Sequence, residues 1–198
     1  MIGIVNYGAG NIFSLTAALD RIGVDYGMVN ATADLDRYDR IIIPGVGHAG
    51  AAMRKLQDTG MVEAILALTK PVLGICVGMQ LLTSYSEEGD AHLLSVVPVR
   101  TLHFSSRIDE KVPHMGWNSI QLQTDNPLFA NIKSGSYFYF VHSFFVEDNP
   151  EYSIAQCSYG QTFCASLQFD NFFGVQFHPE KSGPAGEQLL LNFSKLRV

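Results

Sequence analysis

Residues 71–82 read Pro-Val-Leu-Gly-Ile-Cys-Val-Gly-Met-Gln-Leu-Leu, in which an apolar run leads through a Gly-x-Cys-x-Gly turn into an amphipathic stretch. This order is typical of the strand, sharp turn and helix of a nucleophile elbow, with Cys76 in the place of the usual serine. Gly74 and Gly78 permit the tight turn because glycine has no Cβ that could clash. A buried structural cysteine is the common alternative, but the two flanking glycines favour a nucleophile at Cys76.

A cysteine nucleophile needs a base, and residues 174–183, Gly-Val-Gln-Phe-His-Pro-Glu-Lys-Ser-Gly, supply a candidate. Pro179 biases His178 toward an extended conformation, in which residues i and i+2 point to the same side. Glu180 is therefore expected to accept a hydrogen bond from His178 and to fix its tautomer. The alternative is a surface histidine beside a surface glutamate. Together with the elbow, the segment favours a triad of Cys76, His178 and Glu180.

The third informative stretch is residues 40–50, Arg-Ile-Ile-Ile-Pro-Gly-Val-Gly-His-Ala-Gly. Residues 45–50 match G-x-G-x-x-G, but a dinucleotide fingerprint belongs in the first strand-helix turn, whereas this stretch follows the third expected strand and has Pro44 in the turn. We interpret it instead as a glycine loop that directs backbone N–H groups at a developing oxyanion. The expected oxyanion hole consists of Val46, Gly47 and Val77.

The pattern of the whole chain predicts an α/β fold with a mostly parallel central sheet, flanking helices and an antiparallel extension. Apolar runs at 2–6, 26–29, 41–43 and 72–75 are expected strands, and 12–22, 51–57, 61–69 and 185–196 are expected helices. From about residue 96 to residue 175 the pattern changes to short aromatic and β-branched runs typical of hairpins, at 117–123, 137–146, 153–158 and 164–169. No linker or repeat divides the chain, so residues 1–198 are expected to form one domain.

Composition narrows the class of protein further. Apolar residues make up 47% of the 198 residues, the formal net charge is −6, and no basic run occurs, so a nucleic-acid partner is not expected. Three cysteines suit a reducing compartment, and no apolar run approaches the roughly 18 residues of a membrane span, which makes the cytoplasm the expected location without membrane association. The histidines show no ligand spacing, so we expect neither a metal nor a cofactor.

These motifs, spread over essentially the whole chain, resemble those of the class I glutamine amidotransferases, and most closely the glutaminase subunits of imidazole glycerol phosphate synthases. The segments that carry the resemblance are residues 6–11, 44–47, 74–80, 113–118, 139–143 and 174–183. One departure is Val77, where leucine is usual after the nucleophile, and its backbone N–H is unaffected. Residues 90–107 are less typical of the family.

The resemblance implies a single amidotransferase domain that hydrolyses L-glutamine to L-glutamate through a glutamyl thioester. It assigns the contacts to glutamine to Gly47, Gln80, Ser143 and Phe144. It also implies a heterodimer with a (β/α)₈-barrel cyclase that receives the ammonia through a channel and makes imidazole glycerol phosphate and AICAR in histidine biosynthesis. The residues implied at that interface are Asn11, Trp117, Tyr139 and Lys181.

Blander interpretations and rival functions stand beside these. Gln80 and Lys181 also fit solvated surface positions, Trp117 and Tyr139 fit a core, and the adjacent Glu87 and Glu88 look like solvated loop charges. A paralogue that supplies ammonia to a sugar amidotransferase is the strongest rival function. A cysteine peptidase of similar fold and a non-catalytic binding subunit are weaker ones, because neither explains the combination of Gln80 with a complete triad.

Overall fold

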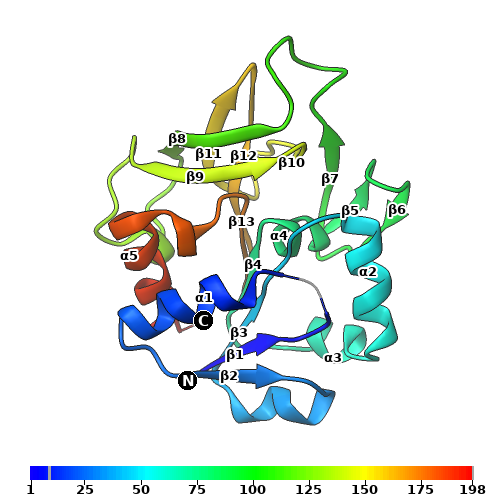
Figure 1. Ribbon diagram of the computed structural model, residues 1–198, viewed down its shortest axis with the longest axis vertical. Coiled ribbons are helices and arrows are strands. Elements are labelled where there is room, and N and C mark those ends of the chain that lie inside the picture. The colour runs from blue at the N-terminus through cyan, green and yellow to red at the C-terminus, as the bar shows by residue number, and fades with distance from the viewer. Residues whose placement is uncertain (9, 198) are drawn as a thin grey trace.

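The computed structural model describes residues 1–8 and 10–197 (Figure 1). Ala9, part of the 6–11 motif, lies outside the described residues. The helices are α1 (Ile12–Arg21), α2 (Ala49–Asp58), α3 (Val62–Leu66), α4 (Val77–Leu81) and α5 (Gly183–Phe193), with 3₁₀ turns η1 (Thr32–Arg37), η2 (Pro127–Phe129) and η3 (Pro179–Lys181). Asn11 begins α1 by accepting a hydrogen bond from the Ser14 N–H, and Gly23 follows its end with φ +65°.

Five parallel strands form one half of the central sheet. Their order is β2 (Tyr26–Val29), β1 (Ile2–Val5), β3 (Arg40–Ile43), β4 (Val72–Ile75) and β13 (Phe172–Val175). The central strands of this half are apolar on both faces because helices and turns cover both sides. The predicted parallel α/β core is confirmed.

The sheet continues from β13 into the predicted antiparallel extension, drawn in the upper part of Figure 1. The next strands are β12 (Gln161–Phe169), β10 (Phe144–Val146), β7 (Val97–His103), β5 (Thr83–Ser86) and β6 (Ala91–His92), with β5 and β7 parallel to each other. A branch runs from β12 to β11 (Ser153–Tyr159), β8 (His114–Leu122) and β9 (Tyr137–His142).

Several expected elements differ from the observed ones: β8 and β12 begin three residues before the expected starts at 117 and 164, and α2 begins two residues before 51. The predicted strand 137–146 is two strands, β9 and β10, which pair with β8 and with β7 and are separated at Ser143. The predicted helix 61–69 is shorter, Val62–Leu66. Beyond it, the carbonyls of Leu68 and Lys70 accept from the side-chain amide of Asn171, and Pro71 disfavours helical backbone at Lys70. The final helix begins two residues earlier than predicted, at Gly183, and ends at Phe193.

The elbow between β4 and α4 is packed so closely that only glycine fits. A Cβ at Gly78 would overlap the carbonyl oxygen of Ile43 at the end of β3, and a Cβ at Gly45 would overlap the backbone of Gly78. The glycines of the Gly-x-Cys-x-Gly motif therefore do more than permit a turn. They allow α4 to begin directly against the neighbouring strand.

We expect Gly78→Ala to lower the free energy of unfolding by about 3 kcal/mol or to prevent folding, because the overlapped atoms belong to backbone that cannot move aside. Urea unfolding followed by circular dichroism measures the change. Ala67→Ser adds one atom at an exposed position and is the control, with an expected change within about 0.5 kcal/mol. Equal stability of the two variants would contradict the close packing.

Candidate active site

Three loops meet at the carboxyl edge of the parallel strands, where α/β proteins commonly bind ligands. Cys76 follows β4, His178 follows β13, and the loop from Pro44 to Gly47 follows β3. The strands are adjacent and in register, with Ile75 beside Val175 and Ile43 beside Gly74. Residues more than 100 positions apart in sequence thus come together because their strands end at the same level.

Cys76 has an unusual backbone conformation. Its φ is 53° and its ψ is −109°, outside the regions that non-glycine residues ordinarily adopt. The Cys76 N–H donates to the Val175 carbonyl at 2.8 Å, and the Gln80 N–H donates to the Cys76 carbonyl at 3.1 Å. These bonds hold the strained turn, as is common where a side chain must be aimed at a site.

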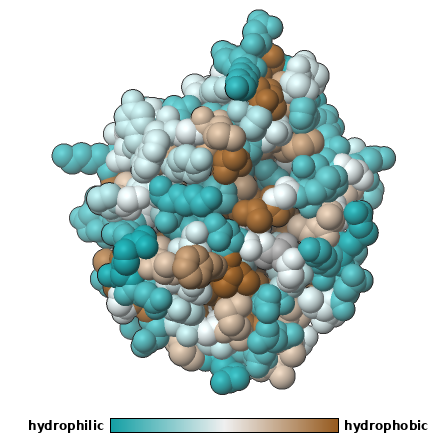
Figure 2. Space-filling model, in the orientation of Figure 1, coloured by the Kyte–Doolittle hydropathy of each residue, from teal (hydrophilic) through white to brown (hydrophobic). Residues whose placement is uncertain are grey.

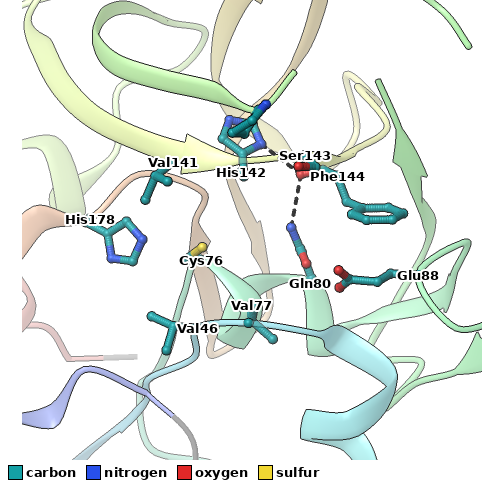
Figure 3. Close-up of a pocket in the computed structure, with 12 residues that line it drawn as sticks. Val46, Cys76, Val77, Gln80, Glu88, Val141, His142, Ser143, Phe144 and His178 are labelled. Atoms are coloured by element: carbon teal, nitrogen blue, oxygen red, sulfur yellow. Dashed lines mark hydrogen bonds between the residues drawn. The ribbon is translucent and has the colours of Figure 1, made fainter. Parts of the chain in front are cut away.

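His178 and Glu180 form a buried pair, with His178 Nδ1 and Glu180 Oε1 2.8 Å apart. The pair does not arise as predicted, since only His178 is extended and residues 179–181 form the 3₁₀ turn η3, which folds the carboxylate back to the ring. The other ring nitrogen faces Cys76 (Figure 3). Burial alone would lower the pKa of His178, but hydrogen bonding and charge from Cys76 and Glu180 outweigh burial and raise it.

Cys76 and His178 open onto a cavity of about 320 Å³. Its wall also contains Val46, Gly47 and Val77 from the expected oxyanion loops, and Gln80, Ser143 and Phe144 from the expected substrate contacts (Figure 3). The remaining wall residues are Glu88, Pro113, Val141 and His142. Glu180 lies behind His178 and does not line this cavity. All three groups of sequence-derived candidates therefore gather at one place.

Gln80 is buried rather than solvated, with 2% of its surface exposed. Its side-chain amide donates to the Phe144 carbonyl at 3.1 Å and to Gln176 Oε1 at 3.2 Å. Gln176 in turn lies with its amide nitrogen 3.7 Å from Cys76 Sγ. Gln176 was not among the candidates from the sequence, although it stands two residues before His178, a spacing that would put both side chains on one face of an extended segment.

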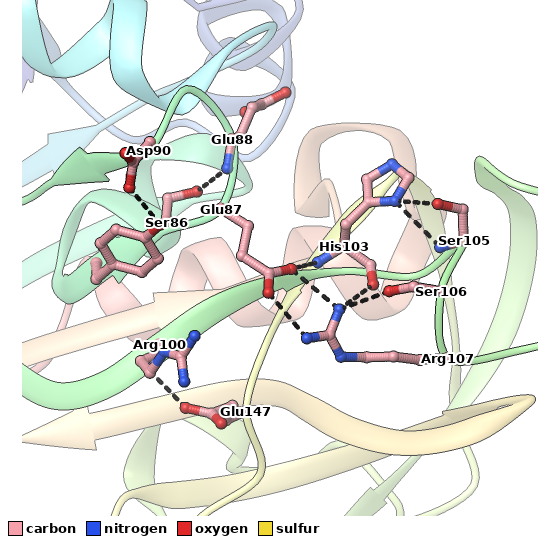
Figure 4. Close-up of polar contacts among 11 residues, drawn as sticks. Ser86, Glu87, Glu88, Asp90, Arg100, His103, Ser105, Ser106, Arg107 and Glu147 are labelled. Atoms are coloured by element: carbon pink, nitrogen blue, oxygen red, sulfur yellow. Dashed lines mark hydrogen bonds and ion pairs between the residues drawn. The ribbon is translucent and has the colours of Figure 1, made fainter.

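Glu88 lies in a turn, as expected, and its partly exposed side chain also lines the cavity. Its carboxylate accepts the Ala49 N–H at the start of α2. Neighbouring Glu87 accepts from the Arg107 guanidinium at 2.8 Å and from the His103 N–H at 2.7 Å (Figure 4). The hydrogen bond with Arg107, more than any other contact, lowers the pKa of Glu87. These bonds anchor the 87–88 segment beside the cavity.

The four expected interface residues lie near the back of the triad. Trp117 and Tyr139 are cross-strand partners on β8 and β9 with ring centroids 6.2 Å apart, and Lys181 Nζ lies 5.8 Å from the centre of the Tyr139 ring. Trp117 is 55% exposed, which excludes the alternative of a core position and is compatible with an interface. Asn11 borders a small hollow that His178 and Glu180 also line.

An exposed apolar strip runs along this pair of strands. Met115, Trp117 and Tyr137 are 62%, 55% and 60% exposed and belong to cross-strand positions of β8 and β9. On the face drawn in Figure 2, small groups of apolar side chains lie between hydrophilic ones, and the strip is defined by its residues and not by this view. A contiguous exposed apolar surface of this kind marks interaction sites.

Other classes of site find no support in the part of the chain that is described. Within residues 1–8 and 10–197, no three histidine, cysteine, aspartate or glutamate side chains gather as metal ligands, and Cys76, Cys157 and Cys164 are all unpaired. None of the described helices is both long enough and apolar enough to cross a membrane.

A parallel α/β sheet with a cysteine elbow and a His-x-Glu segment at one edge defines a class I glutamine amidotransferase, and the family described as glutamine amidotransferase class-I matches residues 3–196. The chain is similar to imidazole glycerol phosphate synthase subunit HisH of Pasteurella multocida, with 47% identity over 97% of this chain and 96% of that one. The subunit HisH of Idiomarina loihiensis is also 47% identical, over 98% and 97%. A crystal structure of a glutamine amidotransferase shares the fold, with a TM-score of 0.74 at 14% identity over 97% of this chain and 96% of that one. The chain belongs to the class I glutamine amidotransferases and, within them, to the HisH family.

Proposed function

We propose that this chain is the glutaminase subunit of an imidazole glycerol phosphate synthase. It hydrolyses L-glutamine to L-glutamate and passes the ammonia to a cyclase subunit in histidine biosynthesis. The observation that carries the proposal is that Glu180 holds His178, which faces Cys76 in the wall of one cavity, together with near-full-length similarity to HisH subunits.

The chemistry follows from the triad. His178 Nε2 takes the proton of the Cys76 thiol, and the thiolate attacks the side-chain carbonyl carbon of glutamine. The carbon–nitrogen bond breaks as His178 returns the proton to the leaving nitrogen, which departs as NH₃ and leaves a glutamyl thioester on Cys76. Water then attacks the carbonyl carbon of the thioester. Glutamate is released, and the thiol of Cys76 is restored.

Backbone N–H groups of Val77 and of the Val46–Gly47 loop stabilise the tetrahedral oxyanion. One such donor is worth about 3–4 kcal/mol of barrier, so a change in the 46–47 peptide would switch turnover. At the other end of the cavity, the Glu88 carboxylate complements the α-ammonium of the substrate. The backbone at Ser143 and Phe144 and the amide of Gln80 complete the cavity.

The exposed strip on β8 and β9 is the surface for the partner, a (β/α)₈-barrel cyclase that forms a heterodimer with this chain. Contact at Asn11, Trp117, Tyr139 and Lys181 places the partner next to the triad, where ammonia leaves. Enclosed passage keeps ammonia unprotonated and therefore nucleophilic. The products of the cyclase are imidazole glycerol phosphate and AICAR.

The test is glutamate release from glutamine by the purified chain, with and without a histidine-pathway barrel cyclase and its ribonucleotide ligand. We expect slow release by the chain alone and a sharp rise in the complete mixture. Equal turnover with and without the cyclase would contradict the coupling, and no release in any mixture would overturn the glutaminase assignment. A rise with a sugar amidotransferase but not with the cyclase would support the rival paralogue.

Tyr7 gives a prediction about the oxyanion loop. Its buried hydroxyl donates to the Pro44 carbonyl at 2.6 Å, directly before residues 45–47. Tyr7→Phe is expected to lower the free energy of unfolding by about 1–2 kcal/mol and to slow glutamine hydrolysis, because the buried carbonyl loses its donor and the loop is freed. Tyr26→Phe, which removes a weak exposed hydrogen bond to Asp20, is the control and should change neither quantity. Unchanged hydrolysis in Tyr7→Phe would contradict a role in holding the loop.

A further inference from the structure

Two buried histidines join the wall of the cavity to the strand that carries Trp117. His114 at the start of β8 and His142 at the end of β9 are cross-strand partners with 3% and 6% of their surfaces exposed. His114 Nδ1 lies 2.9 Å from His142 Nε2, and His142 Nδ1 lies 2.7 Å from the Phe144 carbonyl oxygen. At the far end, Asn118 Nδ2 lies 3.3 Å from His114 Nε2.

The direction of each hydrogen bond in the series from Asn118 to the Phe144 carbonyl follows from the groups at its two ends. A carbonyl oxygen only accepts, so His142 carries its proton on Nδ1 and donates to Phe144. Burial lowers the pKa of His142 to about 3 and that of His114 to about 4, so both rings are neutral. The Nε2 atom of neutral His142 then accepts, and His114 donates from its own Nδ1.

Asn118 completes the order. Its Oδ1 accepts the Ser119 N–H at 2.8 Å and its Nδ2 donates to the Ser158 carbonyl at 2.9 Å, which fixes the amide orientation. The remaining N–H of that amide therefore points its proton at His114 Nε2. All donors run one way, from Asn118 through His114 and His142 to the Phe144 carbonyl.

The Phe144 carbonyl is where this hydrogen-bonded series reaches the cavity. It accepts from His142 Nδ1 and also from Gln80 Nε2 at 3.1 Å, so both of its lone pairs are used (Figure 3). The preceding carbonyl, of Ser143, accepts the Phe104 N–H at 3.0 Å. The wall formed by residues 143–144 and the side chain of Gln80 are thereby fixed relative to each other.

We propose that His142 and His114 are positioning residues for glutamine, holding the 143–144 backbone and Gln80 in place through a one-way hydrogen-bond chain in the Nδ1–H tautomers. The inference rests on the proposed hydrolysis of glutamine in this cavity. The rival explanation is packing alone, since Phe104, Phe140, Tyr159 and Phe163 surround the two rings. Packing requires rings of this shape but no particular tautomer and no donor to Phe144.

Substitution of His142 separates the two explanations by steady-state kinetics in the complete enzyme. His142→Asn keeps a donor at the place of Nδ1 but loses the ring, whereas His142→Phe keeps a ring and loses the donor. If the hydrogen-bonded series positions glutamine, His142→Phe raises KM for glutamine about tenfold with a smaller change in kcat. His142→Asn should have a KM close to that of the wild type. His92→Asn, at an exposed position, is the control. The opposite ranking, with His142→Phe near wild type, would overturn the inference.

A measurement on the unmodified protein covers the case in which a variant fails to fold. Long-range ¹H–¹⁵N spectra of histidine-labelled protein report the tautomer of each ring. We expect His114 and His142 to be Nδ1-protonated and unchanged between about pH 5 and pH 8. An Nε2–H tautomer in either ring would overturn the inference even if glutamine is hydrolysed normally. Absence of hydrolysis in every mixture would instead overturn the proposed function, and the role in glutamine binding with it.

Discussion

Replacement of Cys76 by alanine is expected to reduce glutamate release by about 10⁴-fold or more, because no other group can form the thioester. Cys76 is the cysteine that lines the cavity, faces His178 and is held on a strained turn by its bond to Val175. Glutamine binding should persist in the variant, since Gln80 and Glu88 remain. Coupled assay of glutamate measures the rate, and calorimetry measures glutamine binding.

The other two cysteines supply the control for this prediction. Cys157 and Cys164 lie in β11 and β12 away from the cavity, and burial raises the pKa of each thiol to about 12. Cys157→Ala should therefore retain its turnover, with only some loss of stability from the atoms removed. Iodoacetamide should label Cys76 alone in the folded protein. Turnover of Cys76→Ala within tenfold of the wild type would contradict the nucleophile assignment.

The sequence made the elbow and the residues of the His178–Glu180 pair predictable because both motifs are local, although the pair forms through the turn η3 and not through an extended segment. Glycine spacing, apolar runs and a proline each constrain neighbouring residues, and the strands that flank Cys76 follow directly from them. The contact between the elbow and the His178 segment, in contrast, depends on residues far apart in the sequence. It depends on β13 pairing in parallel with β4 on one side and in antiparallel with β12 on the other, and these strands are distant from one another in the sequence.

The exposure of Trp117 could not be read from local sequence either. Trp117 lies on a strand with apolar residues on both faces, so alternation alone could not decide between the implied interface position and a core position, and only the pairing of β8 with β9 and β11 decides it. The position of Glu88 beside the cavity could not be predicted, because the adjacent Glu87 is anchored by His103 and Arg107, which are 16 and 20 positions away in the sequence. Gln176 is the exception, since its spacing from His178 was visible.

Glu180→Gln is expected to lower kcat by about 10³–10⁴-fold with little change in KM, although it alters only one atom of a side chain that does not line the cavity. A carboxylate only accepts, so it holds the proton of His178 on Nδ1 and leaves Nε2 free to receive the proton of Cys76. An amide can donate to Nδ1 instead. The proton of the ring would then sit on Nε2, where it blocks transfer from the thiol, and the imidazolium would lose its counter-charge.

Two variants separate this tautomer effect from a loss of packing. Glu180→Asp keeps an acceptor and should retain far more activity than the isosteric Glu180→Gln. Aspartate is nevertheless the worse fit in shape, because the Glu180 side chain is only 4% exposed and is closely surrounded. Glu187→Gln removes a carboxylate from an exposed ion pair with Arg21 and should leave kcat unchanged. Because Glu180 contributes to the raised pKa of His178, that pKa should fall in Glu180→Gln. If Glu180→Gln were more active than Glu180→Asp, shape rather than hydrogen-bond direction would govern the base.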